Sequence, residues 1–143
     1  MVTKRAKATN GAARLRGLSF FEGFSDGDLE RVAALADEVE VEPGTCIIDQ
    51  GRVGQECWVV ERGEVGVYVG DEHIVSLGAG AMIGEMALVD RRPRSASVIA
   101  ETPVTLLGFD TKAFRTLLHE MPIAEERVLT LLATRLRAND SRS

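Results

Sequence analysis

The chain has 143 residues, of which 45% are hydrophobic and 27% charged, and its formal net charge is −5 at pH 7. This length predicts one domain with its own core, and the composition is typical of a soluble globular protein. The acidic balance argues against a general nucleic-acid-binding surface, which needs a basic excess. No apolar run approaches the roughly 20 residues of a membrane span. The basic N-terminus is not followed by the apolar core of a secretory signal.

The residues that most often carry metal or nucleophile chemistry are few and scattered. The sequence has two cysteines, Cys46 and Cys57, and two histidines, His73 and His119. Two cysteines in such a chain favour reduced thiols and a cytoplasmic location over a disulfide framework. Neither cysteine has a partner at metal-ligand spacing, and we find no nucleophile–base pair and no Walker-type loop. The sequence therefore predicts no metal, no cofactor and no enzyme activity.

The two ends of the chain differ from its middle. Residues 1–13 are small, polar and basic, and they lack a periodic apolar pattern. This composition favours a disordered, solubilising tail, with a role in binding nucleic acid or an acidic partner as the alternative. We expect one ordered domain over residues 14–138 and a short C-terminal tail over residues 139–143.

The first predicted helix begins near Ser25. This serine can cap the helix with Asp28 three residues later, while Phe24 and Leu29 occupy the positions of a hydrophobic staple. Apolar residues then recur at helical spacing. They are Leu29, Val32, Ala33 and Ala36.

Residues 39–109 follow a period of two instead. Val65, Val67 and Val69 alternate with Gly66 and Tyr68, and glycines separate short strand-like runs. These glycines stand at positions 44, 51, 54, 63, 70, 78 and 80. Short runs at this spacing predict an all-β sandwich or barrel with tight hairpins.

Helical patterns return after Phe109. Asp110 is a suitable cap, and Phe109 and Phe114 occupy staple positions. Pro122 can end this helix and begin another at its first turn. One face of the last helix carries apolar residues, and charged residues accompany it. The apolar set is Val128, Leu132 and Leu136, and the charged set is Glu125, Glu126, Arg127 and Arg135.

The stretch from Gly84 to Val98 combines residue types that suit one anionic ligand. Arg94 follows Glu85 by nine positions, across one predicted helical turn and a loop. A guanidinium can bind two phosphate oxygens at once, and the Ser95 hydroxyl can donate another hydrogen bond. Free N–H groups of a turn over Met86–Val89 can point at the same anion. A carboxylate here would repel a phosphate unless it faced a donor such as a ribose 2′-hydroxyl.

This stretch therefore predicts a cradle for a sugar joined to a phosphodiester. The alternative is an ordinary turn with an exposed Arg–Glu salt bridge, which is worth about 0–1 kcal/mol.

Two segments, Gly84-Glu85-Met86-Ala87-Leu88 and Pro93-Arg94-Ser95-Ala96-Ser97, resemble the phosphate-binding cassette of cyclic nucleotide-binding domains. Such domains occur in bacterial catabolite activator proteins, protein kinase A regulatory subunits and gated channels. The resemblance implies that Glu85 binds the ribose 2′-hydroxyl, and that Arg94 and Ser95 bind the cyclic phosphate. The ligand site it implies comprises Gly84, Glu85, Met86, Ala87, Leu88, Arg94, Ser95 and Ala96. The chain departs from the family pattern at Ile83, usually aromatic, and at 90–92, where many members have a glycine.

The resemblance also implies the architecture. It predicts a mainly β fold, an eight-stranded β-roll of the double-stranded β-helix or jelly-roll kind, with an N-terminal helix and C-terminal helices. In the family the last helix covers the base, and in bacterial activators it also forms the dimer interface. Arg135-Leu136 resembles the segment before the activators' base-contacting pair. This places Asn139 and Asp140, together with Ser97, as candidate base contacts.

These observations lead to a regulatory domain that binds cAMP and repositions its C-terminal helix. Ser95 leaves cGMP open, because a hydroxyl at this position occurs in relatives that bind either nucleotide. The alternatives are a ligand-independent interaction module and the sensor fragment of a larger regulator such as a transcription factor. The expected partners are the nucleotide and either a protein effector or a second copy bound through the last helix. Neither a membrane nor direct nucleic-acid binding is expected.

Overall fold

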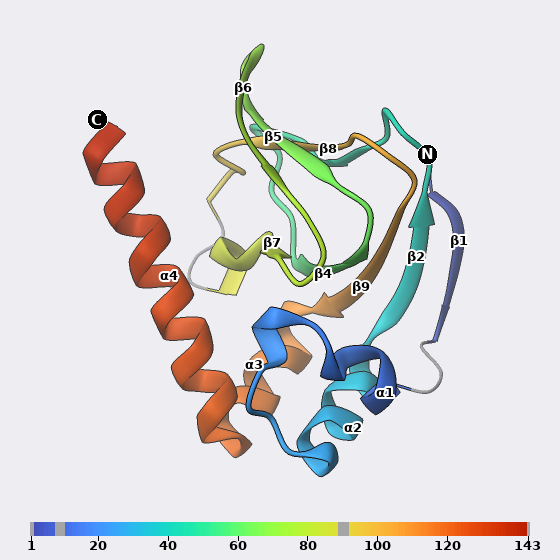
Figure 1. Ribbon diagram of the computed structural model, residues 1–143. Helices are drawn as coiled ribbons and strands as arrows, with labels where there is room; N and C mark the ends of the chain where they lie inside the picture. Colours follow the sequence, from blue (N-terminus) through green and yellow to red (C-terminus); the bar gives the residue numbers. More distant parts are fainter. Residues whose placement is uncertain (1, 8–10, 89–91, 143) are drawn as a thin grey trace.

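The computed structural model describes the backbone of residues 2–7, 11–88 and 92–142. Within these ranges it describes the side chains of residues 11–87, 92–135 and 137. A β-roll makes up the middle of the chain, α1, α2 and α3 gather at its base, and α4 runs along one side (Figure 1). The helices are α1 (Gly11–Arg16), α2 (Asp26–Leu35), α3 (Thr111–Glu120) and α4 (Pro122–Arg142), with 3₁₀ turns η1 (Ser19–Phe21) and η2 (Glu85–Leu88).

The strands form two antiparallel sheets. One has the order β1-β2-β9-β4-β7 and the other β3-β8-β5-β6. The strands are β1 (Val2–Lys7), β2 (Asp37–Val41), β3 (Cys46–Ile48), β4 (Glu56–Arg62), β5 (Val65–Val69), β6 (Glu72–Leu77), β7 (Met82–Ile83), β8 (Ser97–Ala100) and β9 (Val104–Asp110). Strands β2 to β9 are the eight strands of the predicted roll, so the predicted fold class is confirmed. Gly63, with φ of +95°, turns the chain from β4 into β5, as the sequence indicated.

Both ends of the chain differ from the sequence prediction. Instead of a disordered tail over 1–13, residues 2–7 form β1, which pairs antiparallel with the edge of β2, and α1 begins at Gly11. Backbone hydrogen bonding to an open sheet edge does not require the apolar pattern on which the prediction depended. Instead of a tail over 139–143, α4 continues to Arg142. The sequence has neither glycine nor proline between Pro122 and that residue to stop the helix.

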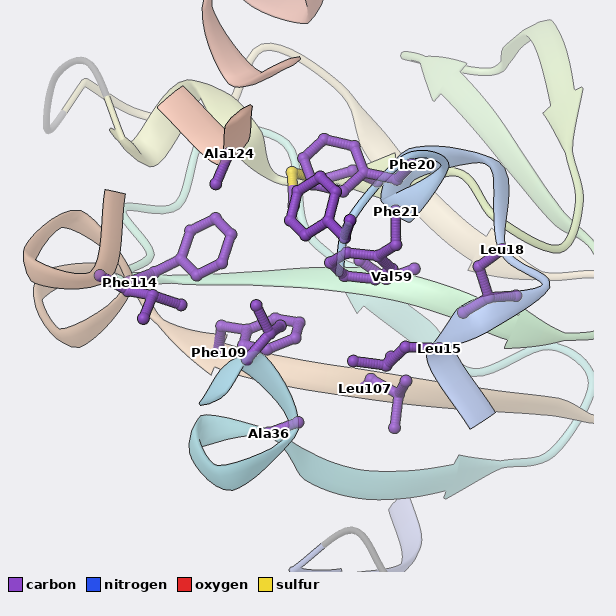
Figure 2. Packing of buried hydrophobic residues seen from close by; sticks show 14 of the residues in the cluster. Leu15, Leu18, Phe20, Phe21, Ala36, Val59, Leu107, Phe109, Phe114 and Ala124 are labelled. Atoms are coloured by element: carbon purple, nitrogen blue, oxygen red, sulfur yellow. The ribbon is translucent and has the colours of Figure 1, made fainter. Parts of the chain in front are cut away.

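Strand β9 supplies side chains to two separate cores, which explains why it is apolar along most of its length. Leu106 belongs to the inter-sheet core, which lies between the two sheets. Leu107 and Phe109 point to the opposite side, into the helix-side core between the strands and the helices. Figure 2 shows this second core, in which phenylalanines from η1, β9 and α3 meet Val59 of β4.

The predicted helix starts are confirmed. The Ser25 hydroxyl accepts a hydrogen bond from the Asp28 N–H at 3.1 Å. The Asp110 carboxylate accepts from the Lys112 and Ala113 N–H groups at 2.8 and 3.3 Å. Capping of this kind is worth about 1 kcal/mol per helix. Pro122 is the first residue of α4, as predicted.

Arg127 attaches α4 to the 3₁₀ turn η1. Its guanidinium donates to the carbonyl oxygens of Ser19 at 3.2 Å, Phe20 at 2.6 Å and Glu22 at 2.6 Å. The same group lies 5.9 Å from the centre of the Phe24 ring. The beginning of α4 is therefore fixed to the N-terminal helical segment, and the rest of the helix extends along the roll.

Candidate functional site

A cavity of about 560 Å³ lies between the roll and α4. This volume is within the range of small-molecule sites. The predicted ligand residues that line it are Gly84, Glu85, Met86, Ala87, Arg94, Ser95 and Ala96. The side chain of Leu88, the remaining predicted residue, lies outside the described residues. Residues 84–87 and 94–96 are thus brought to one cavity.

Glycine at position 84 makes the turn that places Glu85 in the cavity wall. Gly84 has φ of +79°, a conformation that other residues rarely adopt. The 3₁₀ turn η2 follows, and the Ala87 N–H donates to the Gly84 carbonyl at 3.2 Å. After this turn, Glu85 is only 3% exposed and is one of the residues that line the cavity.

Arg94 is held by backbone carbonyls of two segments that are far apart in the sequence. Its Nη1 donates to the Gly84 carbonyl at 3.1 Å, and its Nη2 donates to the Glu56 carbonyl at 2.7 Å. Burial lowers the pKa of the Arg94 side chain, but a guanidinium stays charged in proteins. An oriented cation with donors to spare is suited to binding a phosphate.

Arg135 of α4 reaches the cavity and pairs with the buried carboxylate. Its Nη1 lies 2.9 Å from Oε1 of Glu85, and its Nη2 donates to the Met82 carbonyl at 3.4 Å. Burial raises the pKa of Glu85, and the charges of Arg135 and Arg94 oppose this rise. The sequence pattern marks Arg135 as one of the charged residues of the last helix and does not identify it as the partner of Glu85. The resemblance of Arg135-Leu136 to the activators' segment was the signal that could have identified it.

The β5–β6 hairpin forms an apolar wall of the cavity, which the sequence analysis did not predict. Val69 and Val75 are 40% and 44% exposed, although they are large apolar residues. The wall consists of Val67, Val69, Ile74, Val75 and Leu77. The valine alternation in β5 was the available signal, because Val67 and Val69 lie on the face that includes buried Val65. Such a surface suits the flat, weakly polar face of a base.

Of the three candidate base contacts, only Ser97 has a side chain within the described residues. Ser97 is absent from the lining, and its hydroxyl accepts a hydrogen bond from the Gln50 N–H at 2.9 Å. It therefore braces a neighbouring loop. Asn139 and Asp140 lie in the last turns of α4, and their side chains are outside the described residues.

The thiol of Cys57, which is influenced by the charges of Glu85 and Arg94, is unreactive. Cys57 of β4 is fully buried, and burial, together with the charge of Glu85, raises its pKa to about 12. It is therefore a protonated thiol and not a nucleophile at neutral pH. Among the described residues, no group of three or more His, Cys, Asp or Glu side chains could hold a metal ion. The helices in the described ranges are too short or too polar to cross a membrane.

Comparison with known proteins agrees with this geometry. Residues 38–121, more than half of the chain, match the family model of the cyclic nucleotide-binding domain. The cAMP-dependent protein kinase type II regulatory subunit of Drosophila melanogaster is 34% identical over 104 residues, which are 73% of this chain. This chain spans only 28% of that protein's length.

Two solved structures have the same fold. The catabolite activator protein of Thermus thermophilus superimposes with a TM-score of 0.76 and is 28% identical, covering 86% of this chain and 60% of its own. A cyclic nucleotide-binding domain from Methylobacillus flagellatus KT gives a TM-score of 0.74 and 27% identity, covering 92% and 79%. The match of the family model, the antiparallel roll with its flanking helices and the cassette at the cavity agree. The chain therefore belongs to the family of cyclic nucleotide-binding domains.

Proposed function

We propose that the domain is a sensor whose preferred ligand is cAMP, bound with its phosphate at Arg94 and Ser95 and its ribose at Glu85. The observation that carries this proposal is a single cavity in which a buried carboxylate and a carbonyl-anchored guanidinium lie together. A cyclic nucleotide presents both partners that this pair requires, an anion and a neutral hydroxyl donor.

The phosphate is assigned to Arg94 because the fork of N–H donors on its guanidinium is already oriented in the protein without ligand. Two of its five N–H donors are used in the hydrogen bonds to the Gly84 and Glu56 carbonyls. The other donors can bind a phosphate without further ordering of the side chain, which lowers the entropic cost of binding. Ser95 is exposed and lines the same cavity, so its hydroxyl can add a donor.

The ribose is assigned to Glu85 because a buried carboxylate requires hydrogen-bond donors. The Arg135 guanidinium supplies one partner at Oε1, and a 2′-hydroxyl can supply another. A 2′-hydroxyl is neutral, so it can donate a hydrogen bond to the carboxylate without the repulsion that an anion would meet. A 2′-deoxy nucleotide lacks this donor and should bind more weakly.

We assign the base to the apolar hairpin wall, with cAMP ahead of cGMP. The wall offers stacking and van der Waals contact to Val69 and Val75 on one side of the base. The cAMP preference is supported by the relative from Drosophila melanogaster, whose name states that it belongs to a cAMP-dependent kinase.

The output is assigned to α4. Its Arg135 contacts Glu85, so a ligand that occupies the cavity alters the free energy of the helix position. Leu129 on the same helix is 59% exposed, although it is a large apolar residue. A second copy or a protein effector that covers this face would receive the change.

The proposal is tested by calorimetric titration with cAMP, cGMP and 5′-AMP. We expect saturable 1:1 binding of cAMP, weaker binding of cGMP, and much weaker binding of 5′-AMP, whose phosphate carries an additional charge and is not tied to the ribose. Absence of binding by all three nucleotides would favour the ligand-independent interaction module instead.

A further inference from the structure

The Arg94 guanidinium lies in a narrow slot between two glycines from different loops. A methyl group built on the Cα of Gly54 would lie 2.5 Å from Nη2, 2.9 Å from Nε and 3.1 Å from Cζ of Arg94. A methyl group on Gly84 would lie 3.1 Å from Nη1. Carbon–nitrogen contacts of 2.5 Å are well inside the van der Waals minimum near 3.5 Å. The guanidinium therefore occupies space that a side chain at position 54 would take.

The backbone itself does not require a glycine at position 54. The glycines with positive φ include Gly51 and Gly84, but Gly54 is not among them. At Gly51 the situation is reversed, because φ is +89° and nothing lies within 4 Å of an added methyl group. A glycine can be required by a positive φ or by lack of space for a side chain. At position 54 the reason is space, because the Arg94 guanidinium lies where a side chain would be.

The slot also fixes the direction of the fork. Gly54 precedes Glu56 by two residues, and the Glu56 carbonyl accepts from Nη2 at 2.7 Å. The segment from Gly54 to the first residue of β4 therefore supplies both the acceptor and the space beside it. On the other side, Gly84 supplies the carbonyl acceptor for Nη1 at 3.1 Å. A guanidinium moved out of the slot would stretch both hydrogen bonds.

We propose that Gly54 is a positioning residue for ligand binding, which holds the Arg94 fork in the orientation that grips the phosphate. The inference rests on the proposed function, because it assigns the phosphate to Arg94. Gly54 has no side chain with which to touch the ligand. It acts only through the space that it leaves for the guanidinium.

The first test compares Gly54→Ala with the unmodified chain and with Gly17→Ala. Gly17 is a matched control, because its φ is not positive and nothing lies within 4 Å of an added methyl group. We expect Gly54→Ala to weaken cAMP binding at least tenfold and Gly17→Ala to leave it unchanged. Unchanged affinity in a folded Gly54→Ala variant, where the unmodified chain binds cAMP, overturns the inference.

The second test asks whether the loss passes through Arg94. Arg94→Lys keeps the charge but replaces the fork with a single ammonium group. We expect this change to cost much affinity in the unmodified chain and much less in the Gly54→Ala background, because the fork is already misplaced there. Losses that simply multiply would mean that position 54 acts independently of Arg94.

A third readout needs no nucleotide. In the ligand-free protein, the Arg94 Nε–Hε group should give a distinct ¹⁵N–¹H signal that broadens or shifts in Gly54→Ala but not in Gly17→Ala. This signal separates the two hypotheses. If the unmodified chain binds no cyclic nucleotide but the signal changes, the proposed function fails and the slot stands. If Gly54→Ala is unstable, the double variant Gly54→Ala/Arg94→Ala should recover stability, and no recovery would overturn the inference.

Discussion

At the scale of single residues, Glu85 is a carboxyl group buried in the cavity wall. It is 3% exposed, and burial raises its pKa despite the nearby Arg135 and Arg94. The folded protein therefore keeps the proton on this carboxyl group to a higher pH than the unfolded chain does. Between the ordinary glutamate pKa of about 4.3 and the higher value in the folded state, the contribution of Glu85 to stability falls as the pH rises.

This sign gives a prediction for Glu85→Gln, which cannot titrate. The free energy of unfolding of the unmodified chain minus that of the variant should be larger at pH 4 than at pH 7. Urea denaturation of both proteins at the two pH values measures the difference, and the other carboxyl groups cancel in the comparison. A difference that grows toward pH 7 would show that pairing with Arg135 outweighs burial.

At the scale of elements, α4 is the helix that two arginines attach to the rest of the molecule. Arg127 is bound to three carbonyls around η1, and Arg135 is bound to Glu85 and the Met82 carbonyl. The two residues are eight positions apart, or about 12 Å along the helix axis. The first contact does not involve the cavity, whereas the second does. We therefore expect the two contacts to have different consequences.

Loss of the first attachment should lower stability. Arg127→Ala removes a charged donor from three carbonyls, two of them in exposed hydrogen bonds, and should cost about 1–3 kcal/mol of the free energy of unfolding. Urea denaturation measures this cost. Glu126→Ala, at an exposed position of the same helix, is the control and should change stability by less than about 0.5 kcal/mol. Equal effects of the two changes would mean that the attachment to η1 contributes nothing.

Ligand should act through the second attachment. We expect saturating cAMP to slow amide hydrogen exchange in the part of α4 around Arg135, because the bound nucleotide favours the position in which this side chain meets Glu85. Exchange in β1 should not change, because β1 and β7 lie at opposite edges of the five-stranded sheet. Protection confined to residues 84–98 would leave α4 without a role in the response.

At the scale of the whole molecule, the two cores share strands and should not unfold separately. β9 contributes Leu106 to the inter-sheet core and Leu107 to the helix-side core. β4 contributes to both cores as well, through Val60 and Val59. Because each strand holds both cores, loss of one core disturbs the other.

We therefore predict a single cooperative transition. Trp58, the only tryptophan of the chain, packs against the inter-sheet core and reports on the roll by fluorescence. Circular dichroism at a helix-sensitive wavelength reports mainly on the helices. The two urea transitions should coincide in midpoint and slope. An earlier loss of helix signal would show that the helices detach while the roll persists.

Features that depend on residues close together in the sequence were predictable, and contacts between residues far apart in the sequence were not. Ser25 and Asp110 lie within three positions of the N–H groups that they cap. The cassette residues lie within one continuous stretch, 84–98, so their spacing also carried the information. Arg135 stands fifty positions after Glu85, and Gly54 stands forty positions before Arg94. Only the folded chain brings these pairs together. The pairing of β1 with β2 is made by backbone groups, which have no signature in the side-chain pattern.

Because Cys57 is buried, the rate at which a thiol reagent labels it reports how often the helix-side core opens. A protonated thiol in the helix-side core can react with an aromatic disulfide only in molecules whose packing has come apart. In a Cys46→Ser background, which removes the exposed thiol, the labelling rate of Cys57 counts those openings. A nucleotide that binds only the intact site should lower the labelling rate of Cys57 by the factor 1 + [L]/Kd. Labelling at that reduced rate would measure affinity with no probe added to the site, and an unchanged rate would mean that Cys57 becomes exposed while the ligand stays bound.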